Sequence, residues 1–358
     1  MPTFFFHRTK LIVFLTCVIL TTFLLANLHV NNISSQFYHY VYPKAGIHCF
    51  RIKTNSLPDI TEVRPRKGKS IFFHETSCSS YYNGKISIAA RQACAVESAA
   101  KMNPNLDVYL LYTSPGNFCY EDTQSDRILK ALLSYENVNI LHLDFEKYAK
   151  GTPVEELYER GLIENSAYPT SHASDVLRYL TLWKYGGIYL DLDVIVIKNL
   201  EHIPLNYAGL ESDRNVAAGV LSFAPHGVGH HLAKTCLNDL KEHFNGHDWG
   251  NNGPGVITRL LRSICETDKV KEMSGKDCRG FMVYPPEKFY AIPWWNWTMF
   301  FNEASTDAVF RLSKDSHIIH VWNKHSRHID ISITSRLPYL LYAKKFCPKV
   351  IEQCDDFF

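Results

Sequence analysis

The sequence has no C-x-x-C pair, although it contains ten cysteines. Structural zinc sites commonly use that spacing, so its absence argues against a zinc-stabilised module. Lysine and arginine total 38 and aspartate and glutamate 36, which gives a net charge of +2 without a basic stripe. Because nucleic-acid binding requires concentrated positive charge, no nucleic-acid partner is expected. The sequence also lacks internal repeats and low-complexity tracts.

The longest apolar run covers residues 11–28 and contains no charged residue. As a helix it would be roughly 27 Å long, enough for a thin bilayer. Arg8 and Lys10 precede it, and the next basic residue is Lys44. The positive-inside rule therefore predicts a cytosolic tail at 1–10, a signal-anchor and a lumenal remainder. A cleaved signal peptide is the alternative, but no A-x-A-like site follows the run, which favours an uncleaved anchor.

Nine cysteines follow the apolar run. In an oxidising compartment most of them should pair, and an odd number leaves at least one thiol free. The sequence does not reveal which cysteines pair. Two N-x-S/T sequons, at Asn32 and Asn296, are compatible with a lumenal location. Together these features predict a type II membrane protein of the secretory pathway.

Strand-like and helix-like segments alternate after residue 69. Residues 29–68 lack periodicity and are interpreted as a stem, and residues 69–358 as the lumenal domain. The alternation favours an α/β fold with a mainly parallel sheet, in which ligands gather at the carboxyl ends of the strands. Past Leu200 the pattern is less regular, which indicates an irregular C-terminal lobe. Strands are predicted at 71–73, 106–112, 138–143, 188–190, 194–197 and 220–223, and helices at 86–102, 126–133, 153–160, 171–185, 231–244 and 254–265.

An acidic D-x-D triplet, Asp191-Leu192-Asp193, follows the predicted strand 188–190. If the strand continues through it, both carboxylates point the same way and Leu192 is buried opposite. Two close carboxylates repel each other unless they are protonated or bridged by a cation. Carboxylate oxygens suit Mg²⁺ or Mn²⁺, which proteins often share with substrate phosphates. Because D-x-D is also common at solvated strand ends, the triplet alone does not establish a metal site.

Further motifs precede the triplet. Asp175 and Arg178 lie one turn apart on the predicted helix 171–185, and Gly186-Gly187 would end that helix. Asp175 and Arg178 are either part of a binding site or a simple helical ion pair, which would be worth only ~0.3–0.5 kcal/mol.

The D-x-D block resembles the glycosyltransferases of the GT-A fold, and particularly the α-1,4-glycosyltransferase family. The likeness covers nearly all of residues 69–345. It implies a mainly parallel, Rossmann-like sheet with an irregular acceptor lobe. It also implies a retaining transferase that moves galactose, N-acetylgalactosamine or N-acetylglucosamine from UDP to a terminal sugar. The shared motifs are Ser174–Arg178, Gly186–Asp193, Ile71–Ser77, Cys94–Ala100, Asn251–Pro254 and His320–Lys324.

The resemblance also implies roles for individual residues. Asp193 would bind the metal directly, and Asp191 would contact both the metal and the ribose. His320 would complete the metal shell, although it could instead be a core histidine at a strand end. Further donor-site residues would be Asp175, Arg178, Tyr189, Asn252, Gly253 and Trp322.

Two local features beyond the triplet leave alternatives open. Gly253-Pro254 is typical of a helix start, where free N–H groups can hold a phosphate or a sugar hydroxyl, so Asn252 is either a ligand contact or a cap. Trp294, Trp295 and Trp297 could stack on acceptor sugar, meet lipid or form core.

The predicted protein is a Golgi-membrane enzyme that transfers galactose or N-acetylgalactosamine from its UDP-sugar to a glycosphingolipid, using Mn²⁺ or Mg²⁺. N-acetylglucosamine transfer to glycoprotein O-glycans and an inactive carbohydrate-binding relative are the alternatives. A glycoside hydrolase would need carboxylates some 5–10 Å apart across the sugar, which suits the D-x-D spacing less well than one shared metal.

Overall fold

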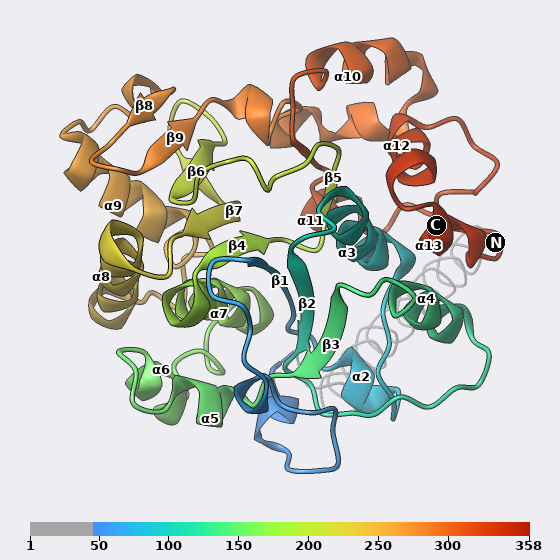
Figure 1. Ribbon diagram of the computed structural model, residues 1–358, viewed down its shortest axis with the longest axis horizontal. Coiled ribbons are helices and arrows are strands. Elements are labelled where there is room, and N and C mark those ends of the chain that lie inside the picture. Colours follow the sequence, from blue (N-terminus) through green and yellow to red (C-terminus); the bar gives the residue numbers. More distant parts are fainter. Residues whose placement is uncertain (1–45) are drawn as a thin grey trace, which may run out of the picture. The chain divides into compact units, whose positions relative to one another are not determined.

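The computed structural model describes residues 46–358, and residues from Ile47 onward form one compact unit (Figure 1). The predicted tail at 1–10 and anchor at 11–28 lie outside these residues. Within the described range, no helix combines the length and the apolarity needed to cross a membrane.

The N-terminal part of the compact unit is packed into the core rather than extended. Ile47, Phe50 and Ile60 are buried, and Cys49 forms a disulfide with Cys78. The stem predicted for residues 29–68 is therefore wrong for the part that follows Gly46, and the boundary lies near residue 47 instead of 69.

An eight-stranded sheet forms the centre of the unit, in the order β3-β2-β1-β4-β7-β6-β9-β8 (Figure 1). Strands β3, β2, β1 and β4 are parallel to one another, whereas β7 is antiparallel to β4 and β6. A mainly parallel sheet is thus confirmed for the half that carries the acidic triplet. Its strands are β1 (Ser70–Glu75), β2 (Asp107–Tyr112), β3 (Val138–His142), β4 (Gly187–Leu190), β6 (Tyr207–Leu210), β7 (Val216–Phe223), β8 (Lys276–Asp277) and β9 (Met282–Tyr284).

A second, two-stranded sheet lies beyond the end of β4. Here β5 (Val194–Val196) pairs antiparallel with β10 (Ile318–His320), and His320 is opposite Val194. This pairing brings a residue from the C-terminal lobe beside the acidic triplet.

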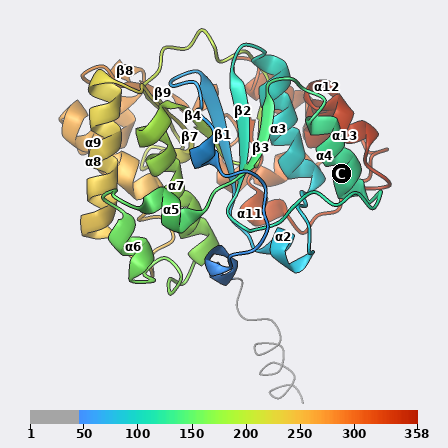
Figure 2. The same ribbon diagram turned by 60° about the horizontal axis from the view of Figure 1, so that its bottom comes forward.

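Helices cover both faces of the large sheet, so that the unit has three layers (Figure 2). One layer contains α3 (Ala90–Met102), α4 (Gln124–Leu132), α12 (Pro338–Phe346) and α13 (Pro348–Glu352). The opposite layer contains α5 (Phe145–Ala149), α6 (Glu155–Glu159), α7 (Pro169–Tyr185), α8 (Gly227–His243) and α9 (Pro254–Cys265). The remaining helices are α2 (Ser79–Tyr82), α10 (Thr306–Leu312) and α11 (Asn323–Ser326), with a 3-10 segment, η5, at Trp294–Phe301.

Helix α7 leads directly into the acidic triplet, and its ends follow from its sequence. Pro169 occupies the first turn, where a missing N–H costs nothing. Gly186 ends the helix with φ +63°, and an added Cβ there would lie 2.5 Å from Pro225 N. At Gly187, with φ +98°, a Cβ would lie 2.4 Å from Ser70 O. Only glycine therefore fits at the start of β4.

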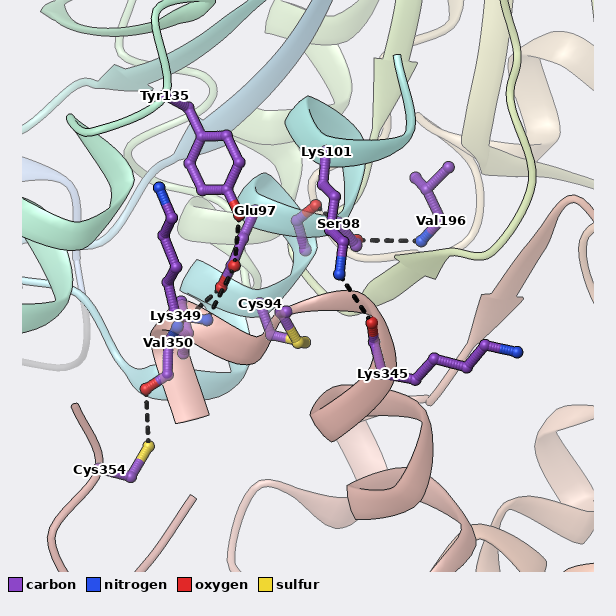
Figure 3. Close-up of a disulfide and its surroundings, with 12 residues drawn as sticks. Cys94, Glu97, Ser98, Lys101, Tyr135, Val196, Lys345, Lys349, Val350 and Cys354 are labelled. Atoms are coloured by element: carbon purple, nitrogen blue, oxygen red, sulfur yellow. Dashed lines mark hydrogen bonds between the residues drawn. A yellow bond between two sulfur atoms is a disulfide. The ribbon is translucent and has the colours of Figure 1, made fainter. Parts of the chain in front are cut away.

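A covalent and polar clamp fixes the C-terminal helices to α3 (Figure 3). Cys94 forms a disulfide with Cys347. One turn further on, the buried Glu97 carboxylate accepts hydrogen bonds from Tyr135 Oη at 2.7 Å and from the backbone N–H groups of Lys349 at 3.0 Å and Val350 at 2.7 Å. A buried carboxylate with three donors is satisfied, so it fixes the start of α13 instead of destabilising the core.

Replacing both Cys94 and Cys347 with serine is expected to lower the free energy of unfolding by about 2–5 kcal/mol, because the loop closed by this disulfide is long. Thermal unfolding of the two variants measures the change. Cys354→Ser is the matched control, since this thiol is partly buried near the clamp but forms no disulfide. Equal melting temperatures for the double variant and the control would contradict the prediction.

Of the nine cysteines in the described part of the chain, six are paired, as expected for an oxidising compartment. Cys119, Cys236 and Cys354 are free.

Candidate active site

The acidic triplet lies in a turn between β4 and β5, not on a continuing strand as predicted. Asp191 N donates to Gly219 O of β7 at 2.9 Å, and Asp193 O accepts from Val321 N at 2.9 Å. These bonds fix both ends of the turn and direct both carboxylates to the same space. Leu192 is only partly buried and lines a cavity, so its predicted burial on the opposite face is wrong.

The two carboxylates meet the imidazole of His320. His320 Nε2 lies 3.1 Å from Asp193 Oδ1 and 3.8 Å from Asp191 Oδ2, and one ligand atom from each residue falls within 4.8 Å of the others. Space for this cluster depends on Gly219, where an added Cβ would lie 2.6 Å from Asp191 Oδ2. Two carboxylates and an imidazole that surround the space left open by Gly219 are suitable ligands for a divalent cation.

Arg178 places a positive charge beneath the cluster. Its guanidinium contacts Asp191 Oδ1 at 3.3 Å and Asp175 Oδ1 at 3.0 Å, and it donates to Ala218 O at 2.7 Å. Burial acts to raise the pKa of Asp191, but Arg178, His320 and Tyr189 together outweigh it and hold this pKa well below its usual range. Asp175 behaves differently, because burial raises its pKa to about 7. Asp191 therefore stays ionised over the whole neutral range.

Tyr189 orients the same carboxylate from β4. Its hydroxyl donates to Asp191 Oδ1 at 2.7 Å and lies 3.0 Å from Ser174 Oγ, while Arg178 stacks 4.7 Å from its ring centroid. Asp191 Oδ1 is thus occupied by protein groups, which leaves Oδ2 for the cluster.

Burial also affects the pKa of the other two residues of the cluster. It raises the pKa of Asp193. It acts to lower the pKa of His320, but the carboxylates of Asp193 and Asp191 outweigh it and raise this pKa.

A cavity of about 660 Å³ opens at the carboxyl end of β1 and reaches the acidic triplet. Asp191 and Asp193 line this cavity, as do residues 74–77. The position agrees with the general rule for ligand sites in parallel sheets. Its other lining residues come from α2, the segment that leads into α3 and its first turn, α4, α7, β4, the acidic triplet and α11: Ser79, Asn83, Ser87, Ile88, Ala89, Gln92, Ser125, Thr170, Ser174, Tyr189, Leu192 and Asn323.

Comparison with known proteins identifies the family. The chain is 33% identical over 293 residues to the rat protein named lactosylceramide 4-alpha-galactosyltransferase. The aligned residues cover 81% of this chain and 77% of that protein. The family model described as alpha 1,4-glycosyltransferase conserved region matches residues 225–354, and a model described as glycosyltransferase sugar-binding region containing DXD motif matches residues 89–210. The chain belongs to the α-1,4-glycosyltransferase family.

The transferase also matches the human protein named alpha-1,4-N-acetylglucosaminyltransferase, at 29% identity over 72% of this chain and 74% of that protein. The matched DXD region implies a nucleotide-sugar donor and a divalent metal for this hexosyltransferase. The predicted family is therefore confirmed, and the α/β architecture agrees with the GT-A fold that the family has.

Solved glycosyltransferases also match, at lower similarity. The glycosyltransferase GlyE of Streptococcus pneumoniae has a TM-score of 0.41 at 14% identity, with 81% of this chain and 63% of that chain covered. Mouse xyloside xylosyltransferase 1 has a TM-score of 0.37 at 15% identity, with 70% and 96% covered. Neither score carries the assignment, which depends on the sequence relatives.

Most of the predicted site residues lie together in the transferase, but Asn252 does not join them. Its buried amide accepts from Asn245 N at 2.9 Å and donates to Asn245 O at 2.8 Å, so it closes its own loop. The adjacent Gly253 does approach the site, because an added Cβ there would lie 2.2 Å from Asp175 Oδ1. Trp322 packs beside His320, with ring centroids 4.2 Å apart, and its Nε1 donates to Ile292 O.

Glu75 was not predicted as a site residue, although it ends strand β1 and the rule that ligands gather at strand ends applies to it. Glu75 Oε1 accepts from Ser77 N at 3.1 Å, whereas its Oε2 is buried without a hydrogen-bond partner at the cavity wall. Burial raises the pKa of Glu75 to about 7. Its position at the carboxyl end of a predicted strand was the feature of the sequence that could have identified it as a site residue.

Glu75→Gln is expected to change how the stability of the transferase depends on pH. Because the folded-state pKa is raised from near 4.5 to about 7, this residue stabilises the fold fully at low pH. That contribution is lost as pH rises through 7, a difference of about 3 kcal/mol that the glutamine variant should not show. Thermal unfolding between pH 4.5 and 8 measures it, with the exposed Glu136→Gln as control. Parallel pH profiles for wild type and Glu75→Gln would contradict the expectation.

Proposed function

We propose that the chain is a retaining α-1,4-glycosyltransferase that transfers galactose, or N-acetylgalactosamine, from its UDP-sugar to the terminal sugar of a glycosphingolipid such as lactosylceramide. The observation that carries the proposal is the Asp191, Asp193 and His320 cluster, whose two carboxylates line a strand-end cavity. The names of the relatives support the choice of sugar and acceptor.

Asp191, Asp193 and His320 would hold Mn²⁺ or Mg²⁺ in this site. The bound cation offsets the negative charge that develops on the departing diphosphate. Arg178 and Tyr189 keep Asp191 ionised and oriented, so that Oδ2 is already available when the donor arrives. Preorganised ligands of this kind need no rearrangement during the reaction.

The wall formed by residues 74–77 would receive the nucleoside part of the donor. The acceptor hydroxyl then attacks the anomeric carbon on the face from which UDP departs. The leaving phosphate takes the acceptor's proton, and the α configuration is retained. The α linkage in the names of both groups of relatives supports this stereochemistry.

The proposal places the enzyme in the Golgi membrane as a single-pass type II protein. Its support is the apolar run at residues 11–28, the basic residues before it and the disulfides of the domain that follows.

The test uses the full-length chain in detergent with a panel of UDP-galactose, UDP-N-acetylgalactosamine and UDP-N-acetylglucosamine. Lactosylceramide and the soluble p-nitrophenyl β-lactoside serve as acceptors, with EDTA, Mn²⁺ or Mg²⁺ added. We expect metal-dependent transfer of galactose or N-acetylgalactosamine, with a small anomeric coupling constant in the product. A large, diaxial coupling would show a β-linkage and overturn the proposal, and turnover with UDP-N-acetylglucosamine alone would reassign the donor.

A further inference from the structure

Helix α11 joins the acidic cluster to a group of aromatic side chains. Asn323 N, at its first residue, donates to Asp193 Oδ2 at 2.9 Å. The next two residues carry the aromatic contacts. Lys324 Nζ lies 3.3 Å from the ring centroid of Trp249, and His325 stacks on Trp294 with centroids 5.7 Å apart. Both indoles therefore contact the helix whose first residue touches the Asp193 carboxylate.

Both indoles remain open to solvent. Trp249 is 41% exposed and Trp294 is 43% exposed, although they come from separate segments, the loop before α9 and η5. Tryptophans that served only as core would be covered by neighbouring side chains. These two instead use one part of their surface to hold α11 and present the rest beside the site.

Two charged side chains beside this group form no ion pair. Glu211, directly after β6, is partly buried, whereas Lys324 is exposed. Within residues 46–358, neither makes a hydrogen bond or an ion pair with another side chain, and the ammonium of Lys324 lies over the face of Trp249. Burial raises the pKa of Glu211, and the charges of Glu211 and Lys324 act on each other.

A partly buried carboxylate without a hydrogen-bond partner is costly, and a ligand that donates to Glu211 would remove that cost. A pyranose fits this set of groups, because its C–H face packs on an aromatic ring while its hydroxyls bond to a carboxylate and an ammonium. A lipid acyl chain would leave the Glu211 carboxylate without a donor. The position of α11 places this ligand next to the cation-binding residues and outside the nucleotide cavity.

We propose that Trp249 and Trp294, together with Glu211 and Lys324, bind the terminal sugar of the acceptor. The proposal rests on the transferase function above and extends it by naming acceptor-binding residues around α11. The donor is bound elsewhere, by the strand-end cavity. Loss of an indole should therefore weaken acceptor binding and leave donor binding intact.

The experiment compares wild type, Trp249→Ala and Trp294→Ala as full-length proteins in detergent. Initial rates with p-nitrophenyl β-lactoside and each active UDP-sugar give separate KM values for acceptor and donor. Each substitution is expected to raise the acceptor KM about tenfold, in line with the loss of one aromatic contact, and to change the donor KM less than about twofold. Phe357→Ala is the control, since this ring is 53% exposed on the C-terminal segment.

A second measurement does not need turnover. Saturation-transfer NMR with p-nitrophenyl β-lactoside alone should show weaker binding to both tryptophan variants than to wild type and Phe357→Ala. If lactoside binding and acceptor KM are unchanged in both variants, the acceptor site is wrong. If wild type binds the lactoside through these residues but turns over none of the UDP-sugars, the sugar site stands and the proposed function fails.

Discussion

Asp193→Ala is expected to lower the rate of sugar transfer at least about a thousandfold, because it removes one of the two carboxylates that would hold the cation at the diphosphate. The fold should change little. Asp193 repels Asp191 in the absence of a cation, so its removal relieves that repulsion and costs the hydrogen bond from Asn323 N and the contact with His320 Nε2. The measurements are kcat with the active UDP-sugar and p-nitrophenyl β-lactoside, and the melting temperature.

Two further variants separate charge from structure. Asp193→Asn keeps an acceptor for Asn323 N but loses the charge, and we expect nearly the same loss of rate. Asp213→Ala removes an exposed carboxylate from the turn between β6 and β7 and should retain full activity. An Asp193→Ala enzyme with more than about a tenth of wild-type turnover would show that the cation is bound elsewhere.

Gly219→Ala is expected to abolish transfer without replacing any polar group. The added Cβ would lie 2.6 Å from Asp191 Oδ2 and 3.2 Å from His320 Nε2. Both are close to or below the limit that real Cβ atoms tolerate, and Arg178 and Tyr189 hold Asp191 from the other side. The methyl group should therefore displace a ligand atom, and we expect at least about a hundredfold loss of kcat with a raised metal requirement.

The matched control is Gly250→Ala. Its Cβ would meet only Asp248 Oδ1, at 3.7 Å, which is ordinary contact, and its activity should be unchanged. Metal titration of Gly219→Ala distinguishes the mechanism. If kcat is lost but the metal concentration at half-maximal rate is unchanged, the substitution acts on the substrate and not on the cation site.

The sequence was sufficient to predict those elements whose bounds depend on neighbouring residues alone. Helix α9 runs from Pro254 to Cys265 as predicted, because proline at the first turn sets its start. The predicted bounds of α7 and β4 are also close to the observed ones, since Gly186 and Gly187 adopt positive φ angles that separate the two elements. The D-x-D pair could be recognised because several motifs occur together in a fixed order.

The sequence was not sufficient to predict features that depend on packing between segments far apart in the chain. The carboxylates of Asp191 and Asp193 converge as predicted, but through a turn that bonds to Gly219 and Val321 fix and not through a continuing strand. Asn252 matched a family motif, but its amide faces its own loop. Residue Ile47 could not be assigned to the core, because no periodicity in the sequence reveals its packing.

The clamp on α3 also has a consequence for biosynthesis. Cys94 and its partner Cys347 are 253 residues apart, so at 5–20 residues per second the ribosome needs roughly 13–50 s to deliver the second thiol. During that interval the Cys94 thiol can pair wrongly with Cys49, Cys78 or Cys119, which are all synthesised long before Cys347. The yield of native enzyme should therefore depend on a disulfide isomerase that corrects premature pairs, and on an oxidising compartment that persists until translation has passed residue 347.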